Sequence, residues 1–112
     1  MKTNVEIHAG ICGFVTHVSA ESEDQQNVNF GIKSNCEKIE ILAVKLNKIQ
    51  PVDAFQEISP TGEGKIMPVV RDTLKGCCAG CAVPAGIFKA MQVSAGLALP
   101  KDISIIFKQT DV

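Results

Sequence analysis

The chain has 112 residues, of which 46% are hydrophobic and 21% are charged. This length and apolar fraction predict a single domain over residues 1–112, with a core that needs no disulfides. The 11 Lys and Arg residues nearly balance the 12 Asp and Glu residues, which does not fit a nucleic-acid-binding protein. No apolar run approaches the roughly 20 residues of a membrane-spanning helix, and the polar first residues do not resemble a secretory signal. We therefore expect a cytoplasmic protein.

Three strands are expected in the first part of the chain. Alternation of apolar and polar residues predicts them at 4–9, 14–20 and 28–33. Gly10 and Gly13 predict a tight loop between the first two strands, and a polar turn joins the second strand to the third. The inward faces are predicted to carry Val5, Ile7, Phe14, Thr16, Val18, Ala20, Val28, Phe30 and Ile32.

Two main helices are predicted from helical spacing and end signals. The first begins at Ser34 and Glu37, which have capping-box spacing, and ends before Pro51. The second begins at Pro84, which suits the first helical position, and ends at Gly96. Its small residues predict close packing against the sheet or a second subunit: Ala85, Gly86 and Ala90.

The middle and the end of the chain complete the predicted fold. We expect one more short helix within 51–58, a loop at 59–64 and a short helix at 68–75, although the valine pair there suits a strand equally well. Residues 103–107, Ile-Ser-Ile-Ile-Phe, predict a last strand. The order β-β-β-α-α-β predicts an α+β domain: a mixed, mainly antiparallel four-stranded sheet with two main helices packed on one face.

Five cysteines are the most informative residues of the chain. In a protein without an export signal, clustered cysteines point to metal binding or catalysis rather than to structural disulfides. If Ala20 opposes Val28 in the antiparallel hairpin, the same register places Cys12 opposite Cys36 at the open end. The other three cysteines, at 77, 78 and 81, precede the second main helix, and whether they reach the same end depends on topology that the sequence pattern does not give.

These residues favour a thiolate site for a metal. We expect a zinc ion or an iron–sulfur cluster bound through four cysteines, with a fifth cysteine as an alternative ligand and one histidine as an additional one. The expected ligands are Cys12, Cys36, Cys78 and Cys81, the alternative ligand is Cys77 and the histidine is His8. The role would be electron transfer, metal handling or accessory binding to a larger redox enzyme.

Two other interpretations stay open. Cys78 and Cys81 could cycle between dithiol and disulfide, although no thioredoxin-like βαβ context surrounds them. Alternatively, the chain is a non-catalytic interaction module whose cysteines are buried structural residues. The sequence contains no P-loop, no GxGxxG and no Ser/His/Asp order, so we assign no enzymatic activity. Its apolar content is compatible with a homodimer.

Four short motifs resemble a family of small uncharacterised cysteine-containing proteins, a domain of unknown function, from anaerobic microbes. The motifs are Gly10-Ile11-Cys12-Gly13-Phe14, Ser34-Asn35-Cys36, Cys81-Ala82-Val83-Pro84 with Lys89 following, and Gly96-Leu97-Ala98-Leu99-Pro100. The resemblance spans nearly the full length and implies no reaction. It does imply the cytoplasm of an anaerobe, where oxygen-sensitive thiolate centres survive.

Overall fold

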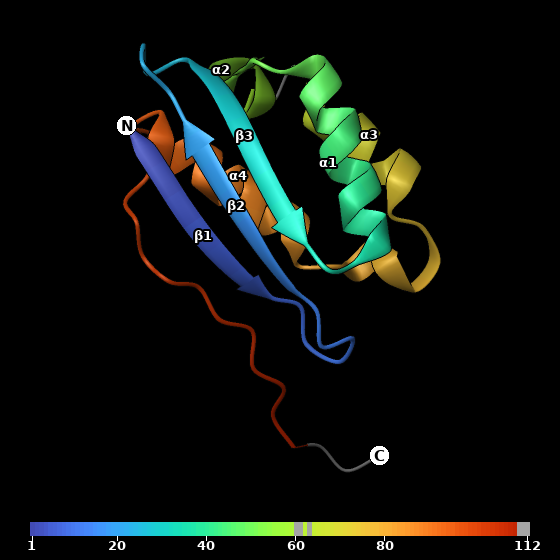
Figure 1. Ribbon diagram of the computed structural model, residues 1–112. Helices are drawn as coiled ribbons and strands as arrows, with labels where there is room; N and C mark the ends of the chain where they lie inside the picture. The colour runs from blue at the N-terminus through green and yellow to red at the C-terminus, as the bar shows by residue number, and fades with distance from the viewer. Residues whose placement is uncertain (60–61, 63, 110–112) are drawn as a thin grey trace.

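The computed structural model describes residues 1–59, 62 and 64–109, and it confirms the α+β class (Figure 1). Four strands, four α-helices and a 3₁₀ helix follow one another along this part of the chain. They are β1 (Lys2–His8), β2 (Val15–Glu21), β3 (Asn27–Ser34), α1 (Glu37–Ile49), β4 (Val52–Asp53), α2 (Ala54–Glu57), α3 (Ile66–Thr73), η1 (Gly76–Gly80) and α4 (Val83–Ser94).

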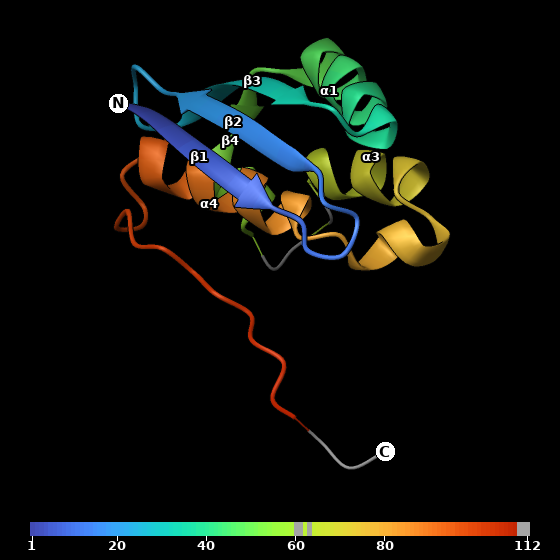
Figure 2. The same ribbon diagram turned by 60° about the horizontal axis from the view of Figure 1, so that its bottom comes forward.

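The sheet has the order β1-β2-β3-β4, and every neighbouring pair of strands is antiparallel. Most of its predicted inward residues join side chains of α1 and α4 in one buried core, while the other face carries exposed polar residues. Phe14 is the exception, because β2 begins only at Val15 and the Phe14 side chain is exposed. Helix α4 packs against β1 and β2, whereas α1 packs against β3 and α3 (Figures 1 and 2). The alternation of the first three strands was therefore a correct guide to the core.

Close packing of α4 on the sheet is confirmed at Gly86. A Cβ atom at this position would lie inside van der Waals distance of the Ile7 side chain on β1. Gly86 and Ile7 are both buried. The absence of a side chain at Gly86 therefore sets how closely α4 approaches β1.

The β2–β3 register differs by two residues from the predicted one. Ala20 pairs with Phe30 instead of Val28. Because side chains alternate with a period of two, both registers turn the same residues inward, and the apolar pattern cannot distinguish them. The observed register depends on the turn, where Gln25 adopts a positive φ of 61°.

The predicted last strand was wrong. Residues 100–109 form no helix or strand and are exposed. The fourth strand is instead β4, a two-residue strand beside β3 that lies in the segment predicted to be helical at 51–58, and α2 occupies the next four residues. The short helix predicted at 68–75 is confirmed as α3. The predicted loop at 59–64 falls partly outside the described residues, at positions 60, 61 and 63.

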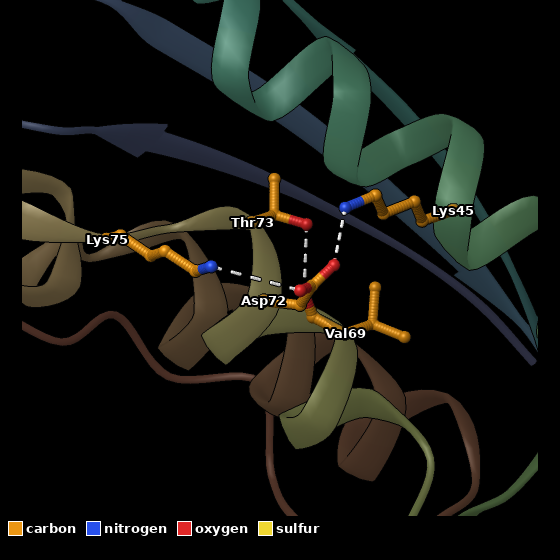
Figure 3. Close-up of polar contacts among 5 residues, drawn as sticks. All are labelled: Lys45, Val69, Asp72, Thr73 and Lys75. Atoms are coloured by element: carbon orange, nitrogen blue, oxygen red, sulfur yellow. Dashed lines mark hydrogen bonds and ion pairs between the residues drawn. The ribbon is translucent and has the colours of Figure 1, made fainter.

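Helix α3 is anchored at both ends. At its start, the buried Glu57 carboxylate accepts the backbone N–H groups of Lys65 and Ile66, each at a shortest distance of 2.8 Å. Near its end, Asp72 pairs with Lys45 of α1 at 2.9 Å, and Lys75 lies 4.0 Å from the same carboxylate (Figure 3). This ion pair ties α3 to α1 just before η1.

The stretch Gly76–Ser94 is long and apolar enough, with a mean hydropathy of 1.2, to meet the criteria for a membrane span. It is not one continuous helix, because η1 ends at Gly80 and α4 begins at Val83. Much of α4 is buried against the sheet. This packing explains its apolar character as that of a core helix.

Candidate thiolate site

Three cysteine-bearing segments lie at one end of the sheet. Strands β1 and β3 both run antiparallel to β2, so the β1–β2 turn and the β3–α1 junction share this end. The segment from η1 to the start of α4 reaches the same end, as both views show (Figures 1 and 2). The shared end predicted for Cys12 and Cys36 is therefore correct, although the register that led to it was wrong.

Cys12 lies in a tight turn between β1 and β2. Gly13 N–H donates to the Gly10 carbonyl at 2.9 Å, and these glycines have φ values of 75° and 94° that side-chain-bearing residues rarely adopt. Ile11 and Cys12 form the middle of the turn, and both are exposed. The predicted Gly10–Gly13 loop thus presents the Cys12 thiol to solvent.

Cys36 is the N-cap residue of α1, and the predicted capping box is wrong. Ser34 belongs to the end of β3, and its Oγ accepts the Cys36 N–H at 3.1 Å instead of capping the helix. Thr16, buried on β2, donates its hydroxyl to the same Ser34 Oγ at 2.8 Å. This chain of hydrogen bonds fixes the backbone of Cys36 while leaving its half-buried thiol without a capping bond.

Cys78 and Cys81 are joined by a turn at the end of η1. Cys81 N–H donates to the Cys78 carbonyl at 3.1 Å. The Cys81 sulfur then accepts the N–H of Val83, the first residue of α4, at 3.5 Å. Both thiols are half-buried and pack against the core, as Cys36 does.

The surroundings of the Cys81 thiol disfavour its deprotonation. Burial raises the pKa of the Cys81 thiol, and the neighbouring sulfurs of Cys12, Cys36 and Cys78 raise it further, while the Val83 N–H acts in the opposite direction. The topology that the sequence left open brings the segment from η1 to α4 to the end of the sheet that holds Cys12 and Cys36 (Figures 1 and 2).

His8 and Cys77 are both exposed, unlike Cys36, Cys78 and Cys81. His8 lies at the end of β1 on the outer face, where its Nε2 is 2.7 Å from a Glu6 carboxylate oxygen. Cys77 lies on η1 and is exposed. Within residues 1–59, 62 and 64–109, no three His, Cys, Asp or Glu side chains are close enough, as they stand, to hold a metal ion.

The donor set is that of a soft-metal site. Thiolates favour zinc, copper(I) and iron–sulfur clusters over hard cations such as calcium. The backbone N–H at the start of α4 is a donor of the kind that stabilises thiolates and metal-bound sulfur. Sequence reasoning missed Thr16 and Val83 as supporting residues. The signal for Thr16 was its pairing with a second hydroxyl residue, Ser34, at the ends of adjacent strands. The signal for Val83 was a free N–H at a helix start, two residues after Cys81.

Among curated proteins and solved structures, no match to the chain is found. One family model does match, and it covers residues 3–107, nearly the whole chain. The protein therefore belongs to a family of unknown function, DUF6951.

Proposed function

We propose that the protein binds a soft metal centre, a zinc ion or an iron–sulfur cluster, through Cys12, Cys36, Cys78 and Cys81. The observation that carries the proposal is that the three separate segments with these four cysteines lie at one end of the sheet (Figure 1). All five cysteines of the chain are free thiols, so none of the four is committed to a disulfide.

A site that holds several thiolates requires a cationic ligand. Burial is the largest cause of the raised pKa of Cys81, and Cys12, Cys36 and Cys78 add to it, because negative charges close together are unfavourable without a positive charge. A bound metal ion reverses this effect, because it stabilises deprotonated thiol ligands. The four cysteines therefore suit a site in which a bound cation neutralises the negative charge of the thiolates.

Binding requires the thiols to draw closer than they lie in the structure. A tetrahedral zinc site holds its sulfurs about 2.3 Å from the metal. The movable parts are the exposed turn with Cys12 and the η1 segment, both bounded by glycines: Gly10, Gly13, Gly76 and Gly80. In contrast, Cys36 and Cys81 are held by hydrogen bonds at helix starts, so we assign them as the fixed ligands.

A dithiol–disulfide function of Cys78 and Cys81 is the second candidate. An attacking cysteine needs thiolate character, which usually comes from a lowered pKa. The pKa of Cys81 is raised, with burial as the largest cause, so in this function Cys78 would attack and Cys81 would resolve the mixed disulfide. A module with merely buried cysteines fits poorly, because Cys12 is exposed in its turn.

The proposed role is electron transfer, metal handling or accessory binding to a larger redox enzyme in a reducing cytoplasm. A cluster would suit an anaerobic cell, where exposed thiolates escape oxidation. The exposed Ile11 beside Cys12 offers an apolar contact for such an enzyme next to the metal.

The test is anaerobic purification of the full chain, followed by metal and sulfide analysis and a visible absorption spectrum. The chain has no Trp and no Tyr, so a chromophore is easily seen. We expect about one centre per chain, coloured if it contains iron and sulfide and colourless if it is zinc. Replacement of Cys12, Cys36, Cys78 or Cys81 by Ser should each reduce the metal content at least about tenfold.

Cys77→Ser is the matched control, because Cys77 is exposed and neighbours Cys78 in sequence. It should keep the metal content of the unmodified protein. A chain that contains no metal and cannot be reconstituted with zinc, or with iron and sulfide, would contradict the proposal. So would equal metal loss in the Cys77 control and the four ligand variants.

A further inference from the structure

The segment after α4 is an arm rich in apolar residues. Residues 100–109 are exposed and belong to no helix or strand, and in both views the segment leaves the domain and runs away from it (Figures 1 and 2). Leu97 still packs against the core, so the arm begins near Leu99. Its side chains are among the most exposed large apolar ones of the described chain: Leu99, Ile103, Ile105, Ile106 and Phe107, from 59% to 94% exposed.

The arm has the sequence of a strand. Residues 103–107 are Ile-Ser-Ile-Ile-Phe, rich in β-branched and aromatic residues. In an extended conformation Ile103, Ile105 and Phe107 share one face, and Ser104 and Ile106 share the other. A strand with such exposed apolar residues is expected to be covered in the functional protein.

Strand β1 offers a matching edge. It pairs with β2 along one side, and among the described residues no strand pairs with its other side. Its inward row includes Val5, which remains only partly buried because the sheet ends there. Residues 100–107 span about 26 Å when extended, which is enough to follow all seven residues of β1.

The family model includes both segments. The matched residues begin at Thr3 on β1 and end at Phe107, the last apolar residue of the arm described by the structure. The arm is thus part of the family sequence and not an appendage peculiar to this chain.

We propose that the arm of one copy adds as a strand to the β1 edge of a second copy, and that the exchange is reciprocal in a twofold dimer. Strand addition pairs the free backbone groups of an edge strand, and exchange of an element between identical copies is a common route to dimers. A second copy fits the direction of the arm, which leads away from its own sheet. Ile103, Ile105 and Phe107 then extend the inward row of β1, beside Val5 and Ile7.

The experiment compares two full-length variants in sedimentation velocity and light scattering. The unmodified protein should have about twice the 11.9 kDa mass of one chain. Ile105→Asp should weaken the dimer at least about tenfold, because a carboxylate would replace an apolar contact. Ser104→Asp, with the same charge on the opposite face of the arm, should retain the dimer. Both positions are exposed in the single chain, so neither variant should unfold it.

Isotope-filtered NMR on an equimolar mixture of labelled and unlabelled chains identifies the contact itself. We expect NOEs between Val5 of one copy and the arm of the other. A monomer whose arm contacts only its own β1 would overturn the proposal. A monomer with a free arm would overturn it too, as would a dimer that Ile105→Asp leaves intact.

Discussion

At one end of the sheet the β2–β3 turn is held by its own side chains, whereas at the other end the β1–β2 turn is held by its backbone. The Asp24 carboxylate accepts both backbone and side-chain N–H groups of Asn27, at 2.7 and 2.8 Å, and the backbone N–H of Gln26 at 3.0 Å. Within the described part of the chain, no side chain of residues 9–14 forms a hydrogen bond, and two backbone bonds close that turn. The β2–β3 turn uses its own side chains to hold its backbone, whereas the β1–β2 turn leaves the Cys12 thiol available for a ligand.

The difference extends to the residues behind each turn. Around the thiol end, the hydrogen bonds of Thr16 and Ser34 hold Cys36 in place, and the start of α4 holds Cys81. The first two bonds hold the backbone of Cys36, and the third holds the sulfur of Cys81 at the start of α4. The comparison teaches that the supporting structure of the thiol end is directed at the cysteines and not at stabilising the turn.

The largest expected effect is that of Gly86→Ala, which changes the packing that supports the start of α4. The added methyl group gains helix propensity of up to about 1 kcal/mol but overpacks Ile7, which costs about 1–3 kcal/mol. We expect a net loss of about 1–2 kcal/mol in the free energy of unfolding, measured by urea denaturation, together with weaker metal binding.

Two variants test the cause. Ala85→Ser changes the exposed neighbour of Gly86 and should alter stability by less than about 0.5 kcal/mol. Ile7→Val removes the methyl group nearest to the new side chain, so the double variant should lose less than the sum of the single changes. Strict additivity would contradict the packing explanation.

Thr16→Val tests the hydrogen bonds that hold Cys36 at the thiol end of the sheet. The substitution removes the hydroxyl that bonds Ser34 and should cost about 1 kcal/mol of stability. Because Ser34 also holds the Cys36 N–H, metal affinity should fall by about tenfold. Ser19→Ala on the outer face of the same strand is the control, and it should leave metal affinity unchanged. If Thr16→Val binds the metal as tightly as the unmodified protein does, the hydrogen bonds of Ser34 do not support the metal site.

The smallest expected effect lies at the Asp24 end and depends on pH. The Asn27 side chain and the backbone N–H groups of Asn27 and Gln26 lower the pKa of Asp24 to about 2. A carboxyl with a lowered folded-state pKa stabilises the fold above its ordinary value near 4 and loses this effect as pH falls toward 2. Asp24→Asn should therefore melt below the unmodified protein at pH 6, and the two should converge near pH 2. Metal binding at pH 7 should not change.

Sequence reasoning was accurate where local pattern decides structure. The alternation of β1 to β3 and the helical spacing of α1 and α4 identified most of the buried residues, and Phe14, which is exposed, was the error. It failed where two different structures, such as two strand registers, are compatible with the same apolar pattern. The register error at Ala20 preserved every face, and only the positive φ of Gln25 distinguishes the two registers. Residues 103–107 have high β-propensity, yet they form no strand in the part of the chain that the structure describes.

The candidate site was predicted as a list of residues but not as a group. Cys12 and Cys36 were brought to one end by strand direction, which does not depend on the register. The approach of Cys78 and Cys81 depends on how α4 crosses the sheet, a long-range packing property that spacing along the chain does not contain. His8 was proposed from its nearness in sequence, but Glu6 holds it on the opposite face.

The most direct test of the central claim is site-resolved alkylation of the native, anaerobically purified chain, with mass spectrometry of each cysteine before and after a chelator. If four thiols form one metal site, Cys77 reacts at once, and Cys12, Cys36, Cys78 and Cys81 react together only after the metal is removed. Rapid alkylation of the exposed Cys12 in the metal-loaded protein, at the rate of Cys77, would contradict the claim.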